Sequence, residues 1–353
     1  MIEIVEHRSL DAADLTRAWD DLTDAGSCPS IFVSRPWVAA WAAAFGGGLE
    51  PLALVGVDAG VPVGLAPLFA RGRVVEFPVN FLSLRGEALV SECDAPAFLG
   101  AALGHLRRRG VAAALRSVPR DSPTYGALSA CRDAGYLPLE TPGRVSPHVD
   151  IAGSWDEYLA SRPRKVTHEW ERKLRKAERE AGFVFRELAP DTDLDALVAG
   201  FVAVDARSWR EGEGTSIGGR GAEGFYGDVT RVLAGAGRLS CFWLEVDGRA
   251  VAFVYGAVFG GVYYALKTSF DEAFSKLSPG VVLFHGAIRR AFEAGLSRFD
   301  FVGETARWKE EWATGRREHA SVVLYPAGPG GLAGYARDAW LKPAVRRLRG
   351  GRP

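Results

Sequence analysis

The spacing of apolar residues changes several times along the chain, and each change predicts a different kind of element. Apolar side chains three or four positions apart predict a helix that ends at Gly26 and a second helix that begins at Pro36. The period then falls to two, which predicts three antiparallel strands joined by tight turns within residues 51–77. A helix over about 95–109 and a strand over 111–118 are expected to follow.

The same order of elements returns in the second half of the chain. Three predicted strands within residues 238–270, a helix over about 279–294 and a strand over 297–302 repeat it, and matching turn residues lie 185 to 189 positions apart. The pattern therefore predicts an α/β (α+β) fold of two tandem domains, each with a mixed, largely antiparallel sheet flanked by helices.

The length of 353 residues also favours two domains. We expect a first domain over 1–150, a second over 151–325 and a basic segment over 326–353. From Tyr335 onward this segment has six Lys/Arg against one Asp. Three interpretations of it stay open: a surface helix, a frayed tail, or a contact with a membrane or RNA.

A predicted helical segment connects the two copies. It begins at Ser154, where a capping box with Glu157 is expected, and continues past Pro163 into a strongly basic stretch. Between Arg162 and Glu180 there are eight Lys/Arg and four Asp/Glu. This pattern indicates either a solvated helix face with ion pairs four residues apart, or a surface that faces a phosphorylated cofactor or RNA.

Composition limits the functions that these domains can have. Apolar residues make up 48% and charged residues 24%, which is typical of a soluble globular protein and excludes collagen, coiled coil and disorder. The 43 Lys/Arg balance the 43 Asp/Glu, so any phosphate-binding site must be local. No apolar run suits a signal peptide or a membrane span, so we expect a cytoplasmic protein without membrane insertion. The four cysteines are far apart and predict neither a metal site nor a disulfide.

A candidate anion site begins the last predicted helix. Ser278 suits an N-cap, Pro279 suits the first turn, and Gly280 lacks a side chain that would cover the free backbone N–H groups there. We expect these residues, with Val281 and the nearby Lys276, to bind the phosphates of a cofactor, although an ordinary capped helix has the same sequence. The matching stretch of the first copy, near residues 92–96, has carboxylates instead. The first domain is therefore expected to be degenerate and the second catalytic.

Polar residues follow the last predicted strand of the second copy. Asp300 lies in an otherwise apolar strand and needs a partner, and Glu304 comes just after the strand end. Lys309 lies between Trp308 and Trp312, where it suits contact with an acyl or sugar group, orientation of a carbonyl, or an ion pair with Asp300. Strand ends are where open α/β sheets bind ligands.

Two glycine motifs match known site patterns without the required context. Neither the G-x-S-x-G string at 214–218 nor the G-x-G-x-x-G string at 219–224 follows a predicted strand. A loop that closes over a substrate explains 211–224 better, with Trp209 and Arg210 at its base. Trp308 and Trp312 are also expected to contact substrate. The remaining expected substrate contacts, Tyr264 and Lys267, lie in the strand before the anion site. His285 is expected to be a packed residue of the last helix.

Three stretches together resemble the CelD/BcsL-like acyltransferases of the GNAT superfamily, which are related in fold to the Fem peptidyltransferases. They are FVSRPWVAAWAAAFG at 32–46, SWREGEGTSI at 208–217, and the stretch from Ser278 to Trp312. The resemblance implies tandem GNAT-like domains, a cofactor pyrophosphate at Ser278–Gly280, and transfer of an acyl group to an amine. It also places Asp300, Gly303 and Lys309 in the family's motif.

The chain departs from this family in two ways. Trp308 stands where the family has tyrosine, so a tyrosine general acid is absent from that position, and the glycine-rich cofactor loop is reduced to Gly280. The leading hypothesis is an N-acyltransferase that moves an acyl group, most simply acetyl, from acyl-CoA to an amine of a small molecule or peptide, without a metal. Asp300 or Glu304 would accept the proton, and Lys309 with strand N–H groups would stabilise the oxyanion. The alternatives are an aminoacyl-tRNA-dependent, Fem-like peptidyltransferase and a non-catalytic binding module.

Overall fold

The computed structural model of the chain describes residues 2–208, 217–218 and 222–341. The chain divides into two compact units. Unit 1 comprises residues 1–145 and 317–353, and unit 2 comprises residues 146–316. No helix of the described part is long and apolar enough to cross a bilayer. The described residues also contain no group of three or more His, Cys, Asp or Glu side chains that suits a metal ion.

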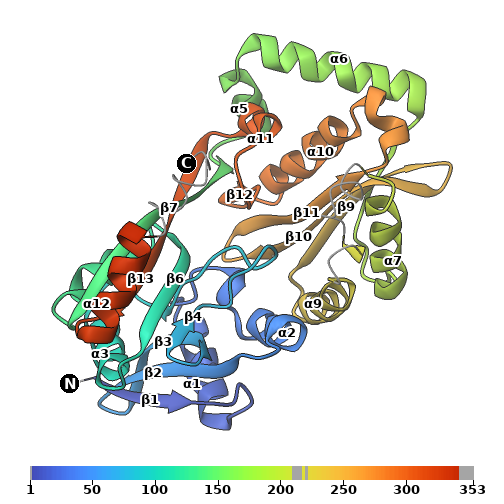
Figure 1. Cartoon of the computed structure of the whole chain (residues 1–353). Coiled ribbons are helices and arrows are strands. Elements are labelled where there is room, and N and C mark those ends of the chain that lie inside the picture. The colour runs from blue at the N-terminus through green and yellow to red at the C-terminus, as the bar shows by residue number, and fades with distance from the viewer. Residues whose placement is uncertain (1, 209–216, 219–221, 342–353) are drawn as a thin grey trace. The chain divides into compact units, whose positions relative to one another are not determined.

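Unit 1 is built on a mostly antiparallel sheet with the strand order β1-β2-β3-β4-β6-β13 (Figure 1). Its strands are β1 (Glu3–His7), β2 (Glu50–Asp58), β3 (Val61–Arg71), β4 (Val74–Glu76), β5 (Leu89–Val90), β6 (Ala112–Pro119) and β13 (Gly315–Pro326). Its helices are α1 (Ala13–Asp24), α2 (Arg35–Phe45), α3 (Ala95–Arg108), α4 (Pro123–Gly126) and α12 (Pro329–Ala336), with short turns η1 (Ile31–Val33), η2 (Ala127–Cys131) and η5 (Arg337–Leu341).

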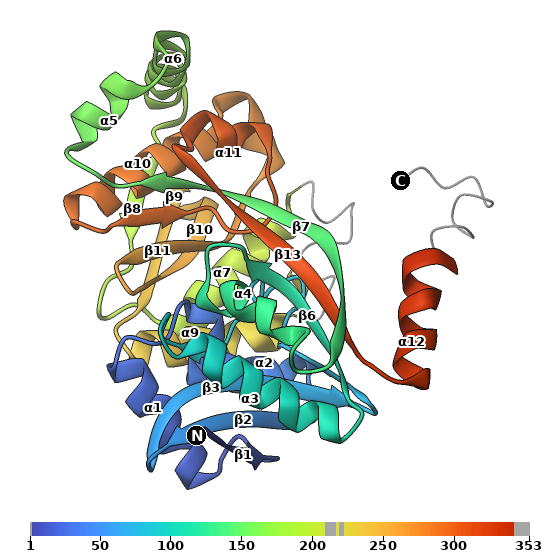
Figure 2. The ribbon, with the colours of Figure 1, turned by 90° about the vertical axis from the view of Figure 1, so that its left-hand side faces the viewer.

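Helix α3 covers one face of the unit 1 sheet through a buried apolar stripe (Figure 2). Phe98 lies at the centre of this contact. A Cβ atom at Gly56 or at Gly64 would come within 2.5 Å of its ring, so both strands need glycine where the helix approaches. The other helices of the unit contribute a second apolar contact, in which Trp41 of α2 packs against Phe69 of β3 at 5.0 Å between ring centroids.

Unit 2 repeats the plan, with the strand order β7-β12-β11-β10-β9-β8. Its strands are β7 (Tyr136–Asp150, whose first part lies in unit 1), β8 (Val184–Glu187), β9 (Leu239–Val246), β10 (Arg249–Phe259), β11 (Val262–Phe270) and β12 (Arg298–Asp300). Its helices are α5 (Trp155–Ser161), α6 (Arg164–Ala181), α7 (Leu194–Asp205), α9 (Glu223–Gly235), α10 (Pro279–Glu293) and α11 (Arg307–Trp312), with the short turn η4 (Glu272–Leu277).

The repeat extends to strand direction. In unit 1 the strand after the helix, β6, pairs in parallel with β4, and in unit 2 the strand after the helix, β12, pairs in parallel with β11. All the other strand pairs whose register is given are antiparallel. The expected fold class is confirmed: two mixed, largely antiparallel α/β modules flanked by helices.

In unit 2, helix α10 packs on one face of the sheet and helices α7 and α9 on the other (Figure 1). Leu283 and Ile288 of α10 are buried against β10 and β11. On the opposite face, Phe201 of α7 stacks on Phe253 of β10 with ring centroids 4.4 Å apart.

The helix between the two copies is not continuous, contrary to the prediction. Helix α5 ends at Ser161, and α6 begins at Arg164 with Pro163 as its N-cap residue. Arg162 is extended, with φ −83° and ψ 152°, because a residue that precedes proline is excluded from the helical region by the proline ring. The capping box of Ser154 and Glu157 is present, as predicted.

Candidate functional site

The central strands of unit 2 separate at one end. Strand β12 pairs with β11 from Val262 to Tyr264, and the described pairing stops there while β11 continues for six residues. After β12 the chain turns away through Val302 and Gly303, both with left-handed backbones of φ 50° and 66°. A left-handed conformation is costly for a β-branched residue, so the surrounding contacts must hold Val302 in place.

Two of the predicted catalytic residues supply those contacts. The Asp300 carboxylate, 1% exposed, accepts the Val302 N–H at 2.9 Å. The Lys309 ammonium donates to the carbonyl oxygens of Val302, at 2.7 Å, and Glu304, at 3.0 Å. The structure thus brings Asp300, Glu304 and Lys309 together at one turn, and Asp300 and Lys309 both hydrogen-bond to its backbone.

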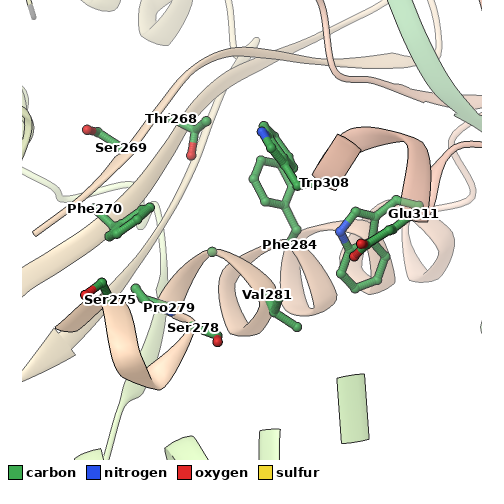
Figure 3. Close-up of a pocket in the computed structure, with 12 residues that line it drawn as sticks. Thr268, Ser269, Phe270, Ser275, Ser278, Pro279, Val281, Phe284, Trp308 and Glu311 are labelled. Carbon is green, nitrogen blue, oxygen red and sulfur yellow. The ribbon is translucent and has the colours of Figure 1, made fainter. Parts of the chain in front are cut away.

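A pocket of about 300 Å³ lies beside the last residues of β11, which no longer pair with β12 (Figure 3). Its walls come from the end of β11, the start of α10, and α11. The predicted cofactor residues Ser278, Pro279, Gly280 and Val281 line it, and so do the predicted substrate residues Trp308 and Trp312. Asp300, Glu304, Lys309 and Lys276 are not among the described residues that line it.

The first turn of α10 presents open backbone to this pocket. Ser278 is the N-cap residue, as predicted, but its backbone is left-handed at φ 53° and its hydroxyl caps no N–H among the described residues of the helix. Pro279 has no N–H, and the Gly280 N–H precedes the first bond of the helical ladder. A Cβ atom added at Gly280 would meet no described atom within 4 Å. The Val281 N–H already donates to the Ser278 carbonyl at 2.9 Å, so this end of the pocket offers space and the Gly280 N–H at the positive pole of a helix.

A second lysine lies at the loop before this end of the pocket. The Lys276 side chain is exposed, and its backbone carbonyl accepts a hydrogen bond from the ammonium of Lys176 at 3.0 Å. Helix α6 thus places Lys176 at the loop before α10. The sequence contained the signal for this residue only as one of many cations in a basic helix.

Tryptophans form the opposite wall. Trp308 is 37% exposed and packs on Phe284 of α10 with ring centroids 4.8 Å apart. Trp312 is buried and stacks on Trp170 of α6, with centroids 3.6 Å and planes 11° apart. The Tyr158 hydroxyl donates to the Trp312 carbonyl at 2.6 Å and fixes the end of α11. The pocket wall is therefore rigid at Trp312 and accessible at Trp308.

Several lining residues were not predicted. Thr268 and Phe270 close the pocket from β11, Phe284 from α10 and Glu311 from α11. Phe284 lies four positions after Gly280, so the helix that starts at Pro279 brings both to one side. For Thr268 and Phe270 the signal was their place at the end of a strand that leads into the candidate anion site.

The predicted substrate residues of β11 lie away from this pocket. Tyr264 is buried, and the Lys267 ammonium lies 3.0 Å from the carboxylate of Asp205, the last residue of α7. Lys267 of β11 pairs with Tyr255 of β10, on the sheet face covered by α7 and α9. The next pair in the ladder is Ala265 with Gly256, so Leu266 has no partner residue in β10 and forms an irregularity. Asp205 is fully buried and also accepts the Ile217 N–H at 2.6 Å. The predicted contacts Trp209 and Arg210, and most of both glycine motifs, lie outside the described residues.

The histidine of α10 is packed, as expected. The His285 ring meets the Trp155 ring edge-on with centroids 5.0 Å apart. Burial, with a smaller contribution from Arg289, lowers the pKa of His285 and keeps it neutral at physiological pH. An uncharged, ring-packed imidazole on this side of α10 suits a role in packing.

Comparison with known proteins finds similarity to one family model and to several solved structures. The family model of the acetyltransferase (GNAT) domain matches residues 164–310, from the start of α6 into α11. The crystal structure of FemX is similar, with a TM-score of 0.62, 12% identity, and coverage of 91% of this chain and 96% of that one. A tandem GNAT protein from the clavulanic acid biosynthesis pathway has a TM-score of 0.51 at 12% identity, covering 93% and 99%. No curated protein matches the chain. At these identities the structures show the fold, which is a tandem GNAT-like one.

Proposed function

We propose that the chain is an N-acyltransferase that binds an acyl-CoA, most simply acetyl-CoA, in the pocket of unit 2. The acyl group would pass to the amine of a small molecule or peptide. The observation that carries the proposal is the open start of α10, with free space and a backbone N–H at Gly280, at the end of a largely apolar pocket. Its cytoplasmic location and its placement with CelD/BcsL-like enzymes belong to the same proposal.

The residues of the pocket suit the parts of such a donor. The Gly280 N–H and the positive end of α10 would bind the diphosphate, with Val281 lining the pocket beside it, and Phe284 and Trp308 would cover the apolar arm of the donor. After Tyr264, β11 no longer pairs with β12, so this edge of β11 offers backbone donors and acceptors to an extended ligand. The donor would supply an activated acyl thioester.

Transfer then requires a proton acceptor and donors for the oxyanion. The amine nitrogen would bond to the thioester carbon, the thiolate of CoA would leave, and the amine would lose a proton. We assign the proton to Glu304, through water, because its carboxylate is exposed beside the turn, whereas Asp300 is buried and bonded to Val302. Backbone N–H groups of β11 near the Leu266 irregularity would stabilise the oxyanion. Tyr264 and Lys267, which the sequence predicts to contact substrate, lie away from this pocket and take no part in the proposed step.

Calorimetric titration of the protein with acetyl-CoA and with free CoA tests the proposal. Binding of both with Kd values between about 1 µM and 1 mM is expected, as for ordinary enzyme substrates. Release of free CoA thiol in the presence of a panel of primary amines would then identify the acceptor. Failure of both CoA forms to bind would contradict the assignment of the donor.

An aminoacyl-tRNA-dependent peptidyltransferase is the second candidate, favoured by the similarity in fold to FemX. The basic helix α6 supports it only weakly, because Arg172, Arg175 and Lys176 each lie within 4 Å of a glutamate of the same helix. Binding of charged tRNA that weakens steeply as salt rises, without binding of acetyl-CoA, would favour this candidate over the first.

Lys309→Met is expected to act on the turn rather than on the chemistry alone. Loss of the bonds to Val302 and Glu304 removes two charge-assisted hydrogen bonds, so the free energy of unfolding should fall by about 2 kcal/mol. Acetyl-CoA affinity and turnover should fall together, because the turn at Val302 and Gly303 leads the chain away from β11 and so leaves the space that forms the pocket. Urea unfolding, calorimetry and CoA release measure the three effects.

The control for this substitution lies on the same helix. Arg307 has a 97% exposed side chain, and Arg307→Met should change none of the three quantities. Lys309→Arg should recover part of the stability. If Lys309→Met abolished turnover but left stability and acetyl-CoA affinity intact, Lys309 would belong to the chemical step and not to the turn.

A further inference from the structure

One charged side chain of the unit 2 pocket takes no part in binding the proposed acyl donor. Glu311 of α11 lines this pocket together with Phe284, Trp308 and Trp312, whose side chains are aromatic. Figure 3 shows its carboxylate on the α11 side of the pocket, away from Ser278 at the start of α10. The Glu311 side chain is 34% exposed, so the neighbouring rings remove part of it from water. A partly desolvated carboxylate in an aromatic wall is stabilised by a cation.

The protein supplies this carboxylate with a weakly held cation. Among the described residues, Glu311 forms its ion pair with Arg307 of the same helix, at 3.8 Å between nitrogen and oxygen. The Arg307 side chain is 97% exposed, and such an ion pair contributes little because water screens it. Arg162 also approaches, but it donates to the backbone carbonyl of Glu311, at 3.3 Å. A cationic ligand can therefore replace Arg307 at the carboxylate with little loss of stability.

The two helices that line the pocket give it two regions of opposite electrostatic character. At the start of α10, the Gly280 N–H and the positive pole of the helix favour an anion. On α11, the Glu311 carboxylate favours a cation. The aromatic wall of Phe284 and Trp308 suits the apolar part of a ligand. The pocket therefore suits one anionic group and one cationic group, each next to apolar surface.

We propose that Glu311 binds the ammonium group of the acyl acceptor, so that the acceptor is a primary alkylamine that enters the pocket as a cation. This assignment rests on the proposed function, in which the acyl donor binds at the start of α10. Glu311 determines specificity, because its carboxylate binds an alkylammonium more tightly than a neutral or anionic molecule of the same size. Proton removal stays with Glu304, so Glu311 acts on binding of the acceptor and not on the chemical step.

Ligand-observed NMR titration of the full chain with hexylammonium, hexanol and hexanoate tests this charge preference without any acyl donor. The three probes share one apolar chain and differ in the charge of the end group. Hexylammonium should bind about tenfold more tightly than hexanol, which is the effect expected of a charge-assisted hydrogen bond, and more tightly than hexanoate. Trp308→Ala should weaken binding of all three probes, because its ring lines the pocket that the apolar chain enters.

Glu311→Gln should remove the preference for hexylammonium over hexanol and leave the Kd of acetyl-CoA unchanged, whereas Glu311→Asp, which keeps the charge, should retain the preference. The matched control is Glu310→Gln on the same helix. The Glu310 carboxylate accepts a hydrogen bond from Arg316 at 3.0 Å and is not among the described groups that line the pocket, so the preference should stay. Glu304→Gln should also keep the preference while lowering turnover. Gly280→Asp should weaken binding of acetyl-CoA but not of hexylammonium.

Absence of hexylammonium binding, equal affinities for hexylammonium and hexanol, or tighter binding of hexanoate would each overturn the proposal. So would a preference for hexylammonium that persists in Glu311→Gln, with the thermal unfolding midpoint of each variant as the check on folding. Acetyl-CoA binding is measured separately by calorimetry. If acetyl-CoA binds and the amine preference is absent, the assignment of Glu311 fails and the proposed function stands. If neither CoA form binds, the proposed function fails whatever the amine titration shows.

Discussion

Gly280→Asp is expected to weaken acetyl-CoA binding on the order of 100-fold or more while leaving the protein folded. The space for the new side chain exists, because a Cβ atom there meets no described atom within 4 Å. A carboxylate in the first turn of α10 stabilises the helix but repels a bound diphosphate. Two unit charges about 5 Å apart interact by about 3 kcal/mol at an effective dielectric constant near 20. That energy corresponds to more than 100-fold in Kd, measured by calorimetry.

Gly280→Asn supplies the matched control, since asparagine has the size of aspartate without its charge. It should weaken binding by less than about tenfold. Equal losses for the two variants would mean that space, not charge, decides binding at this position. Unchanged binding by Gly280→Asp would place the donor phosphates elsewhere and would contradict the assignment of the α10 start as the anion site.

Trp312→Ala should give the largest loss of stability, a decrease of about 4 kcal/mol in the free energy of unfolding. The indole is buried and stacks on Trp170 at 3.6 Å, so its removal leaves a cavity beneath the pocket and exposes its partner. Urea unfolding measures the loss. A double-mutant cycle with Trp170→Ala should show a coupling of about 1 kcal/mol from the stacked rings.

Trp308→Ala separates the structural role from the ligand role. This side chain is 37% exposed and lines the same pocket, so the expected loss of stability is smaller, about 1–2 kcal/mol. Its main effect should be weaker acetyl-CoA binding, because the ring covers the pocket beside Phe284. If Trp308→Ala destabilised the protein as much as Trp312→Ala without changing affinity, the outer wall would serve packing alone.

Part of the candidate site was accessible from sequence because its signals are local. Ser278, Pro279 and Gly280 are consecutive, and the residue types alone predict a helix start with free N–H groups. The structure places all three at a pocket. Asp300 was correctly expected to need a partner, and the sequence did not show that the backbone of Val302 would hydrogen-bond to both Asp300 and Lys309.

The strands that connect the two units were missed for a physical reason. β7 contains Pro138, Pro142 and Pro147, which interrupt the alternation that identifies a strand. β13 pairs with β6, whose residues lie about 200 positions earlier. Pairing over such separation decides that these segments are strands, and no window of the sequence contains that information.

The sequence by itself determined the duplicated order of elements, the start of α10 and the balance of charge, because each depends on neighbours within a few turns of chain. Only the tertiary structure decided which side chains meet. Trp170 and Trp312 stack although 142 positions separate them, and Lys176 reaches the α10 loop from another helix. The direction of a side chain in a sheet depends on which strand its own strand pairs with and on where the pairing ends. The pairing of β12 with β11 ends at Asp300, and the turn that follows brings the Val302 backbone within hydrogen-bond distance of Asp300 and of Lys309 in α11.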